Sequence, residues 1–92
     1  MTDLTLRLKR EYFEQIRDGI KTEEYRLCKE YWRTRLEGRD YARIILTHAY
    51  PSRDDHEKRI VRPWRGYTIK TITHPHFGPD PVAVFAIDVR PE

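Results

Sequence analysis

The first nineteen residues change their hydrophobic period once, and this change constrains the fold more than any other feature of the chain. Leu4, Leu6 and Leu8 alternate with polar residues, as in a strand with one buried face. The segment REYFEQIRDG instead places apolar side chains at helical spacing and ends in Gly19, which is typical of a helix C-terminus. A strand followed directly by a helix predicts a domain of mixed α and β structure.

The later segments extend this pattern with more strands than helices. One further helix is expected, with Trp32 and Leu36 in the core at four-residue spacing. Turn-forming residues in PSRDDHEK and HPHFGPDP predict loops over 51–58 and 74–81. We therefore predict an α+β fold, a small curved sheet or β-barrel of about five strands flanked by two short helices. The expected segments after the first helix are TEEYRL (strand), KEYWRTRLEG (helix), YARIILTHAY (central strand), GYTIKTIT (strand from Gly66) and VAVFAIDV (closing strand).

Length and composition limit the class of protein. The 92 residues are expected to form a single domain over 1–92, and their two Trp, six Tyr and three Phe argue against disorder. The sequence shows no apolar run of membrane-spanning length and no secretory signal pattern, so we expect a cytoplasmic protein without a membrane partner. Cys28 is the single cysteine, which excludes an intrachain disulfide and a cysteine-based zinc site. We expect no cofactor, and the oligomeric state is left open.

The basic residues are unusual in kind and in placement. Thirteen of the eighteen Lys and Arg residues are Arg, whose planar guanidinium suits phosphate and carboxylate. Residues 26–65 hold eleven basic against six acidic residues, a net charge of +5, whereas the remainder sums to −2. This asymmetry favours a polyanionic partner such as RNA or a nucleotide. A solvated arginine-rich surface is the alternative.

The segment GIKTEEYR, residues 19–26, concentrates ionisable groups directly after the first helix. On a strand, side chains alternate between two faces, and Tyr25 with Leu27 is the apolar pair, so we expect that pair to face the core. Glu24 and Arg26 then face a cleft or solvent. The two expected faces are Thr22, Glu24 and Arg26 on one side, and Glu23, Tyr25 and Leu27 on the other.

Three side chains of this segment could form a binding site. Glu24 and Arg26 are expected roughly 6–7 Å apart along the strand, and Lys21 can reach over the same face from the preceding turn. A carboxylate between two cations can accept hydrogen bonds from a base edge or a sugar hydroxyl, while the cations can meet phosphate. The alternative is an ion pair along the strand that only closes the mouth of the barrel.

The segment also resembles the G-x-K-T-x-E-x-R signature of the ASCH domain family, whose fold is PUA-like. The resemblance continues, in the same order, in YWRTRL, ILTHAYP, PWRGY and VFAIDV, and is to the small stand-alone bacterial or phage type. It implies a small β-barrel flanked by short helices, with the signature at the edge of a cleft. It also implies binding of RNA or a nucleotide.

Some members of that family are enzymes, so a hydrolase acting on acylated cytidines or on RNA is an alternative function. In the acylcytidine amidohydrolases the resemblance implies a lysine, a nucleophilic threonine and a glutamate. Lys21 matches the lysine, but Glu24 occupies the place of the threonine, and no residue matches the glutamate. If the chain is an enzyme, its catalytic candidates are Lys21, Thr22 and Glu24. A third alternative is a regulatory domain that binds an acidic protein through surface arginines such as Arg33 and Arg39.

Several aromatic residues are candidates for stacking on bases. Trp64 lies between Arg62 and Arg65, so its surroundings are expected to be solvated. Tyr50 precedes Pro51 at a strand end and could line the same cleft. The full set of expected ligand-binding residues is Lys21, Glu24, Arg26, Tyr50, Trp64, Arg65 and Tyr67.

The histidines are not expected to form a metal site. His74 and His76 flank Pro75 with no cysteine nearby, so they are interpreted as part of loop structure. His48 is expected to be a polar group with its hydrogen bonds satisfied on a buried strand, and His56 lies in a charged loop. The predicted metal content is none.

Overall fold

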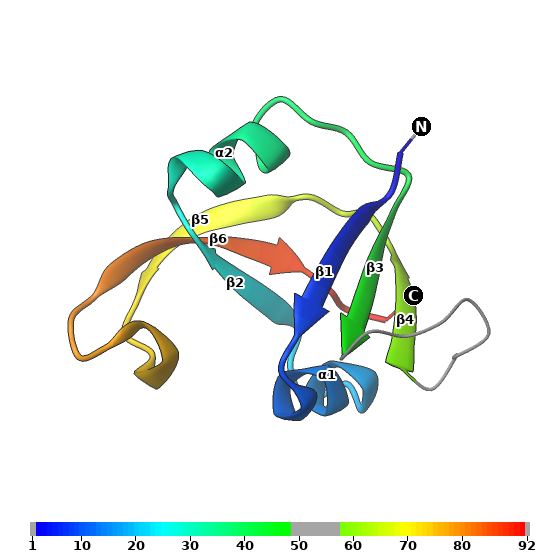
Figure 1. The fold of residues 1–92 in the computed structure, drawn as a ribbon, viewed down its shortest axis with the longest axis horizontal. Helices are drawn as coiled ribbons and strands as arrows, with labels where there is room; N and C mark the ends of the chain where they lie inside the picture. The colour runs from blue at the N-terminus through cyan, green and yellow to red at the C-terminus, as the bar shows by residue number, and fades with distance from the viewer. Residues whose placement is uncertain (1, 49–57, 92) are drawn as a thin grey trace.

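The computed structural model describes residues 2–48 and 58–91, which form six strands, two α-helices and one 3₁₀ turn (Figure 1). The expected loop over 51–58 lies outside the described residues except for Lys58, and Tyr50 lies outside them too. The elements in chain order are β1 (Leu4–Leu8), α1 (Arg10–Arg17), β2 (Glu23–Leu27), α2 (Glu30–Leu36), β3 (Arg43–His48), β4 (Arg59–Pro63), β5 (Tyr67–Ile72), η2 (Pro75–Phe77) and β6 (Val82–Asp88).

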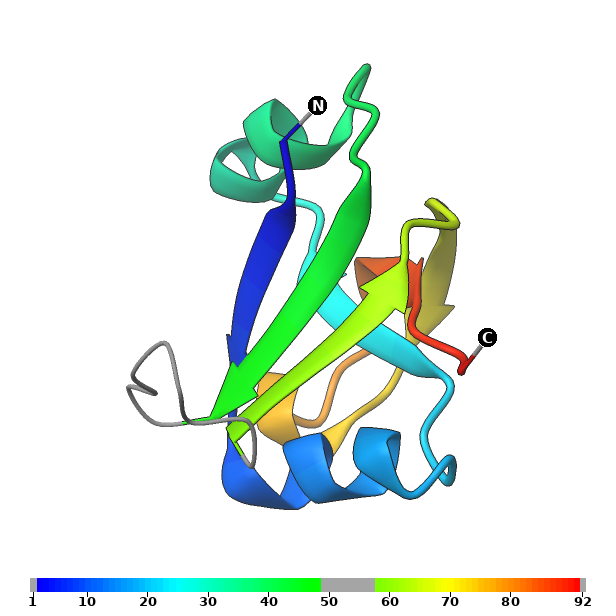
Figure 2. The same ribbon diagram turned by 90° about the vertical axis from the view of Figure 1, so that its right-hand side faces the viewer.

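The strands form two sheets of three strands each, in the orders β1-β3-β4 and β2-β6-β5. β1 runs parallel to β3, and the other paired strands are antiparallel. Figure 2 looks onto the first sheet, with α1 across its lower end and α2 near its upper end. The α+β class is therefore confirmed. Across residues 2–48 and 58–91 the two sheets are not joined into the expected closed barrel.

The core fills the space between the sheets. β1 alternates buried and exposed residues along its whole length, as its sequence pattern predicts. β3 and β6 are the central strands of their sheets, and their longer apolar runs supply residues to the core. The buried core consists of Leu4, Leu6, Leu8, Phe13, Ile16, Leu36, Ile44, Leu46, Ile60, Phe85, Ile87 and Val89.

The two helices cover opposite ends of this core. α1 buries Phe13 and Ile16 and is followed by Gly19 at a φ of 77°, a left-handed conformation that glycine adopts without steric cost. α2 buries Leu36, as expected, but Trp32 is only partly buried and packs at the margin of the core. Neither helix in the described part of the chain is long and apolar enough to span a bilayer.

Strand β4 was not predicted from the sequence. It is an edge strand in which Ile60 alone is buried, while Val61 is 46% exposed. Two arginines and a terminal Pro63 make its sequence resemble a loop. β5 begins at Tyr67, one residue after the expected start, and the expected loop over 74–81 contains the η2 turn.

Candidate functional site

The inner face of β2 is its charged face. Glu24 and Arg26 lie opposite Ile87 and Phe85 of β6, and both β6 residues belong to the core. Residues paired in an antiparallel ladder share a face, so the two charged side chains point between the sheets. The expectation that Tyr25 and its neighbour Leu27 form the core face is wrong, because both are only partly buried and outside the core cluster.

Glu24 is the centre of the site. Its side chain is only 5% exposed, and it is held between two cations. Nη1 of Arg26 donates to Oε2 of Glu24 at 2.7 Å, and Nζ of Lys21 lies 3.6 Å from Oε1. A buried carboxylate needs such partners because burial without compensation is costly. The three signature residues therefore form one cation–carboxylate–cation cluster.

Arg26 also joins the two sheets. Its Nη2 donates to the backbone oxygen of Arg7 on β1 at 3.2 Å, and its Nη1 also approaches the backbone oxygen of Tyr25 at 3.3 Å. Its Nε is buried and has no hydrogen-bond acceptor among the residues that the structure describes. The guanidinium carbon lies 5.2 Å from the centre of the Trp32 ring. Most of the hydrogen-bonding capacity of Arg26 is thus used within the protein.

Lys21 is positioned by aromatic rings as well as by Glu24. Its Nζ lies 4.5 Å from the ring centre of Tyr25 and 5.2 Å from that of Tyr12 on α1. An ammonium group over an aromatic face is attracted by the negative charge of the π-system. These contacts hold the Lys21 side chain, which is only 14% exposed, against the wall of a cavity.

This cavity, called here the signature pocket, has a volume of about 130 Å³. A cavity of about 150 Å³ can hold a benzene ring, so the signature pocket matches one aromatic ring. Residues from β1, α1, β2 and the η2 region meet around it, as the arrangement in Figure 1 allows. Its lining residues are Arg7, Leu8, Lys9, Tyr12, Lys21, Glu24, Tyr25, Arg26, His74, His76 and Phe77.

The aromatic wall of the pocket was missed by the sequence analysis. The ring of His74 lies 5.9 Å from the rings of both Tyr12 and Phe77, and its Nδ1 accepts a hydrogen bond from the backbone N–H of His76. His74, His76 and Phe77 belong to a segment interpreted only as a loop, and more than 45 residues separate it from the signature. Among residues 2–48 and 58–91 no three His, Cys, Asp or Glu side chains are grouped to hold a metal ion.

The tyrosines of the pocket remain protonated over a wide pH range. Burial, followed by the charge of Glu11, raises the pKa of Tyr12 above its usual value. Burial, followed by the charge of Glu23, also raises the pKa of Tyr25, whose hydroxyl donates to Glu23 at 3.2 Å. Both rings therefore stay neutral and can serve as stacking surfaces.

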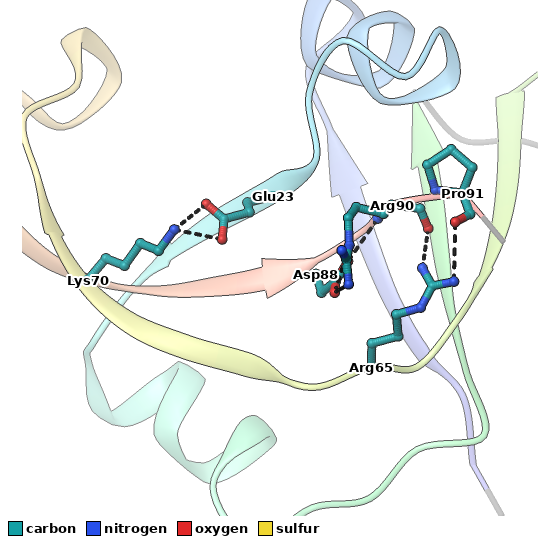
Figure 3. A network of polar contacts seen from close by, with 6 residues as sticks. All are labelled: Glu23, Arg65, Lys70, Asp88, Arg90 and Pro91. Carbon is teal, nitrogen blue, oxygen red and sulfur yellow. Dashed lines mark hydrogen bonds and ion pairs between the residues drawn. The ribbon is translucent and has the colours of Figure 1, made fainter.

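Three candidate residues line a separate groove along β2, β5 and β6, called here the outer groove. Thr22 is exposed and lines this groove, so the expectation that it shares the face of Glu24 is wrong. Arg65 lines it as well, and Tyr67 borders it while its ring packs inward on Phe85. In Figure 3 the guanidinium of Arg65 points to the backbone oxygens of Arg90 and Pro91, at 2.6 and 3.2 Å.

The other charged side chains of this outer groove pair with one another. Lys70 donates to both carboxylate oxygens of Glu23 at 2.8 Å, and Arg90 pairs with Asp88 at 2.7 Å (Figure 3). The Glu23 hydrogen bond raises the pKa of Lys70, and Arg90 lowers the pKa of Asp88. The charged side chains of this groove are thus paired within the protein.

The remaining aromatic candidates are held by the core. Trp64 packs against it with its ring 5.1 Å from that of Tyr41, in an edge-to-face arrangement. Tyr67 packs in the same manner on Phe85, at 4.9 Å. Tyr50 lies outside the described residues. Of the seven expected ligand-binding residues, the structure brings together Lys21, Glu24 and Arg26.

No family model, no curated protein and no solved structure matches this chain. The chemical capacity of the site is therefore taken from its geometry. The signature pocket combines a hydrogen-bond acceptor in Glu24, a donor in Lys21 and neutral aromatic rings within a space suited to one ring. A concave site with apolar walls and a few polar groups is the usual form of a small-ligand site.

Proposed function

We propose that this chain is a small RNA- or nucleotide-binding domain of the ASCH type with a PUA-like fold, and that the signature pocket receives one base. The observation that carries the proposal is the buried Glu24, held by Lys21 and Arg26 in a cavity of about 130 Å³ with aromatic walls. The convergence of four residues of the GIKTEEYR segment, Lys21, Glu24, Tyr25 and Arg26, on one cavity supports this proposal.

The polar groups of the pocket suit the edge of a nucleobase. A carboxylate oxygen of Glu24 can accept a hydrogen bond from an exocyclic amino group, such as N4 of cytosine. The ammonium of Lys21 can donate to a ring carbonyl on the same base. The rings of Tyr12 and Tyr25 provide faces on which a base can stack. Donor, acceptor and stacking surface are thus available to a single ring.

The charge of the pocket suits a phosphate outside it. Among its lining residues, four are Lys or Arg and one is acidic. Glu24 is buried and paired, whereas Lys9 is exposed. The solvent-accessible charge is therefore positive, and it attracts the phosphate of a nucleotide whose base occupies the cavity.

The geometry supports binding more than hydrolysis. No Ser, Thr or Cys lines the signature pocket among the described residues, and Thr22 lies in the outer groove. The structure therefore gives no support to a threonine nucleophile that acts beside Lys21. Docking of an acidic protein on α2 is also less well supported, since Arg33 pairs with Glu37 and Arg39 donates to a backbone oxygen.

Titration of the ¹⁵N-labelled protein with cytidine 5′-monophosphate at low salt, followed by amide chemical shifts, tests this function. We expect shifts at Tyr12, Lys21 and Tyr25, with little change at Tyr67 and Lys70 in the outer groove. Shifts confined to the outer groove, or none with any of the four common ribonucleotides, would contradict the proposal.

A further inference from the structure

A second hollow adjoins the signature pocket, with a volume of about 550 Å³. The two hollows share Arg7, Tyr25, Arg26, His76 and Phe77, so they lie side by side, and together they are called here the groove. The additional residues that line the second hollow are Thr5, Leu6, Leu27, Lys29, Tyr31 and Trp32.

We infer that this groove binds single-stranded nucleic acid, with one base in the signature pocket and a neighbouring base on Tyr31 and Trp32. The inference rests on the proposed function and goes beyond it in two respects. It makes an oligonucleotide, not a free nucleotide, the preferred ligand. It also assigns a second stacking subsite to α2.

The length of the groove suits more than one nucleotide. Its wall on the β1 side runs from Thr5 to Lys9, a backbone stretch of about 13 Å at the usual rise of a strand. Figure 1 shows α2 near one end of β2 and α1 near the other. The first hollow is lined by Glu24–Arg26 and the second by Tyr25–Leu27, so the two hollows follow one another along β2. A single nucleobase ring would fill only the smaller hollow.

Tyr31 and Trp32 of α2 give the second hollow a stacking platform in which the two rings meet edge to face, so that a base would stack on one ring and touch the edge of the other. Tyr31 is 57% exposed, so its ring is accessible to a ligand. Its ring lies 4.9 Å from that of Trp32 at an interplanar angle of 80°, and the Arg35 guanidinium lies 3.5 Å from its ring centre. Exposed aromatic rings beside guanidinium groups are the usual means of stacking single-stranded bases.

Arg26 connects the two subsites. Its Nη1 pairs with Glu24 in the signature pocket, and the central carbon of its guanidinium group lies 5.2 Å from the centre of the Trp32 ring. It therefore contributes to the wall of both hollows. A base stacked at Trp32 and a base beside Glu24 would lie on either side of the same arginine.

The charge of the groove favours a nucleic acid over a protein. Its lining residues include five basic side chains and only one acidic one, the buried Glu24. Lys9 and Lys29 are exposed and immediately precede α1 and α2, towards the two ends of the groove. Basic residues interleaved with aromatic ones are the pattern of single-strand binding, where cations follow the backbone and rings stack the bases.

The two tryptophans allow a direct test. Trp32 lies in the groove, whereas Trp64 packs against Tyr41 on the core. In a Trp64→Phe protein the fluorescence of Trp32 reports on the second subsite alone. This protein is titrated with cytidine 5′-monophosphate and with oligocytidylates of increasing length. We expect quenching by oligocytidylates and an affinity roughly tenfold higher than that of the mononucleotide, as one base–aromatic stack can supply.

Tyr31→Ala then tests the platform itself, because the exposed Tyr31 can be removed without opening the core. We expect the ratio of oligocytidylate to mononucleotide affinity to fall roughly tenfold, while Trp64→Phe retains the ratio of the unmodified protein.

Equal affinities for mononucleotide and oligocytidylate would overturn this inference and leave the proposed function standing. A tighter oligocytidylate complex that is indifferent to Tyr31→Ala would overturn the second subsite. Failure of both ligands to bind at low salt, together with failure of the other three common ribonucleotides, would overturn the proposed function and this inference together.

Discussion

Nη1 of Arg26 donates a hydrogen bond to Oε2 of Glu24 at 2.7 Å. The two residues are two positions apart on the same inner face of β2. The pair lies at the margin of the core, with Phe85 and Ile87 opposite it in the ladder. Glu24 therefore has a structural and a binding role at once, because the arginine that neutralises it also ties β2 to β1. Substitutions at Arg26, Lys21 and Glu24 separate these roles.

Arg26→Ala is expected to destabilise the protein by about 3 kcal/mol, since removal of one partner leaves a buried carboxylate incompletely compensated. The free energy of unfolding from urea titration measures the effect. Arg90→Ala provides the control, because its pair with Asp88 is largely exposed, with the Arg90 side chain 59% accessible. A loss for Arg26→Ala no larger than that for Arg90→Ala would show that the inner pair is not buried in solution.

Lys21→Met is expected to weaken cytidine 5′-monophosphate binding roughly tenfold, which corresponds to the loss of one charge-assisted hydrogen bond of about 1.5 kcal/mol. Met keeps an unbranched stem beside Tyr12 and Tyr25, and the closer partner Arg26 still neutralises Glu24, so the fold is expected to be retained. Isothermal titration calorimetry gives the dissociation constant. Lys70→Met, on the outer face, is the matched control and should bind as the unmodified protein does. Equal weakening by the two variants would place the ligand elsewhere.

Oligocytidylate binding is expected to weaken as salt is added, because cations of the groove displace counterions from the phosphates. Lys29→Gln should reduce the slope of log K against log salt by about 0.7, the value for one phosphate contact on a single strand. Fluorescence titrations at several salt concentrations measure the slope. Arg33→Gln removes a charge from another side of α2, in a different hollow, and should leave the slope unchanged. An unchanged slope in Lys29→Gln would exclude this lysine from the phosphate path.

Asp88 is expected to make the folding stability of the protein depend on pH at the acidic end of the range. Arg90 lowers the pKa of the folded Asp88 below its ordinary 3.8, so its stabilising contribution is present above that value. The contribution is lost as the pH falls through the lowered pKa of the folded state. Thermal unfolding of the unmodified protein and of Asp88→Asn, from neutral to strongly acidic pH, measures this. The stability difference between them should shrink in acid, and a constant difference would contradict the role of the pair.

The sequence alone predicts the elements whose patterns are local. The alternation of Leu4, Leu6 and Leu8 predicts β1, and helical spacing with Gly19 predicts α1, because each pattern is complete within one element. β4 was missed because an edge strand buries few residues, here Ile60 alone, and so carries no clear period. Whether two sheets join into a barrel is a property of strand pairing, which a single sequence does not encode locally.

The site was predicted in part for the same reason. Lys21, Glu24 and Arg26 come from one segment, and their shared location follows from strand alternation and the turn before it. The choice of core face failed at Tyr25, because hydrophobicity alone cannot show that two cations neutralise a buried carboxylate. The sequence did not predict that Tyr12 and residues 74–77 form the aromatic wall, because only the fold brings these distant segments to β2.

The most direct test of the central claim compares the cytidine 5′-monophosphate affinity of Glu24→Gln with that of Glu23→Gln. These neighbours on β2 face opposite sides, Glu24 towards the signature pocket and Glu23 towards Lys70. We predict that Glu24→Gln weakens binding at least tenfold, while Glu23→Gln binds as the unmodified protein does and both retain a dispersed amide spectrum. Equal affinities in the two variants, or a larger loss in Glu23→Gln, would contradict a base-binding site built on Glu24.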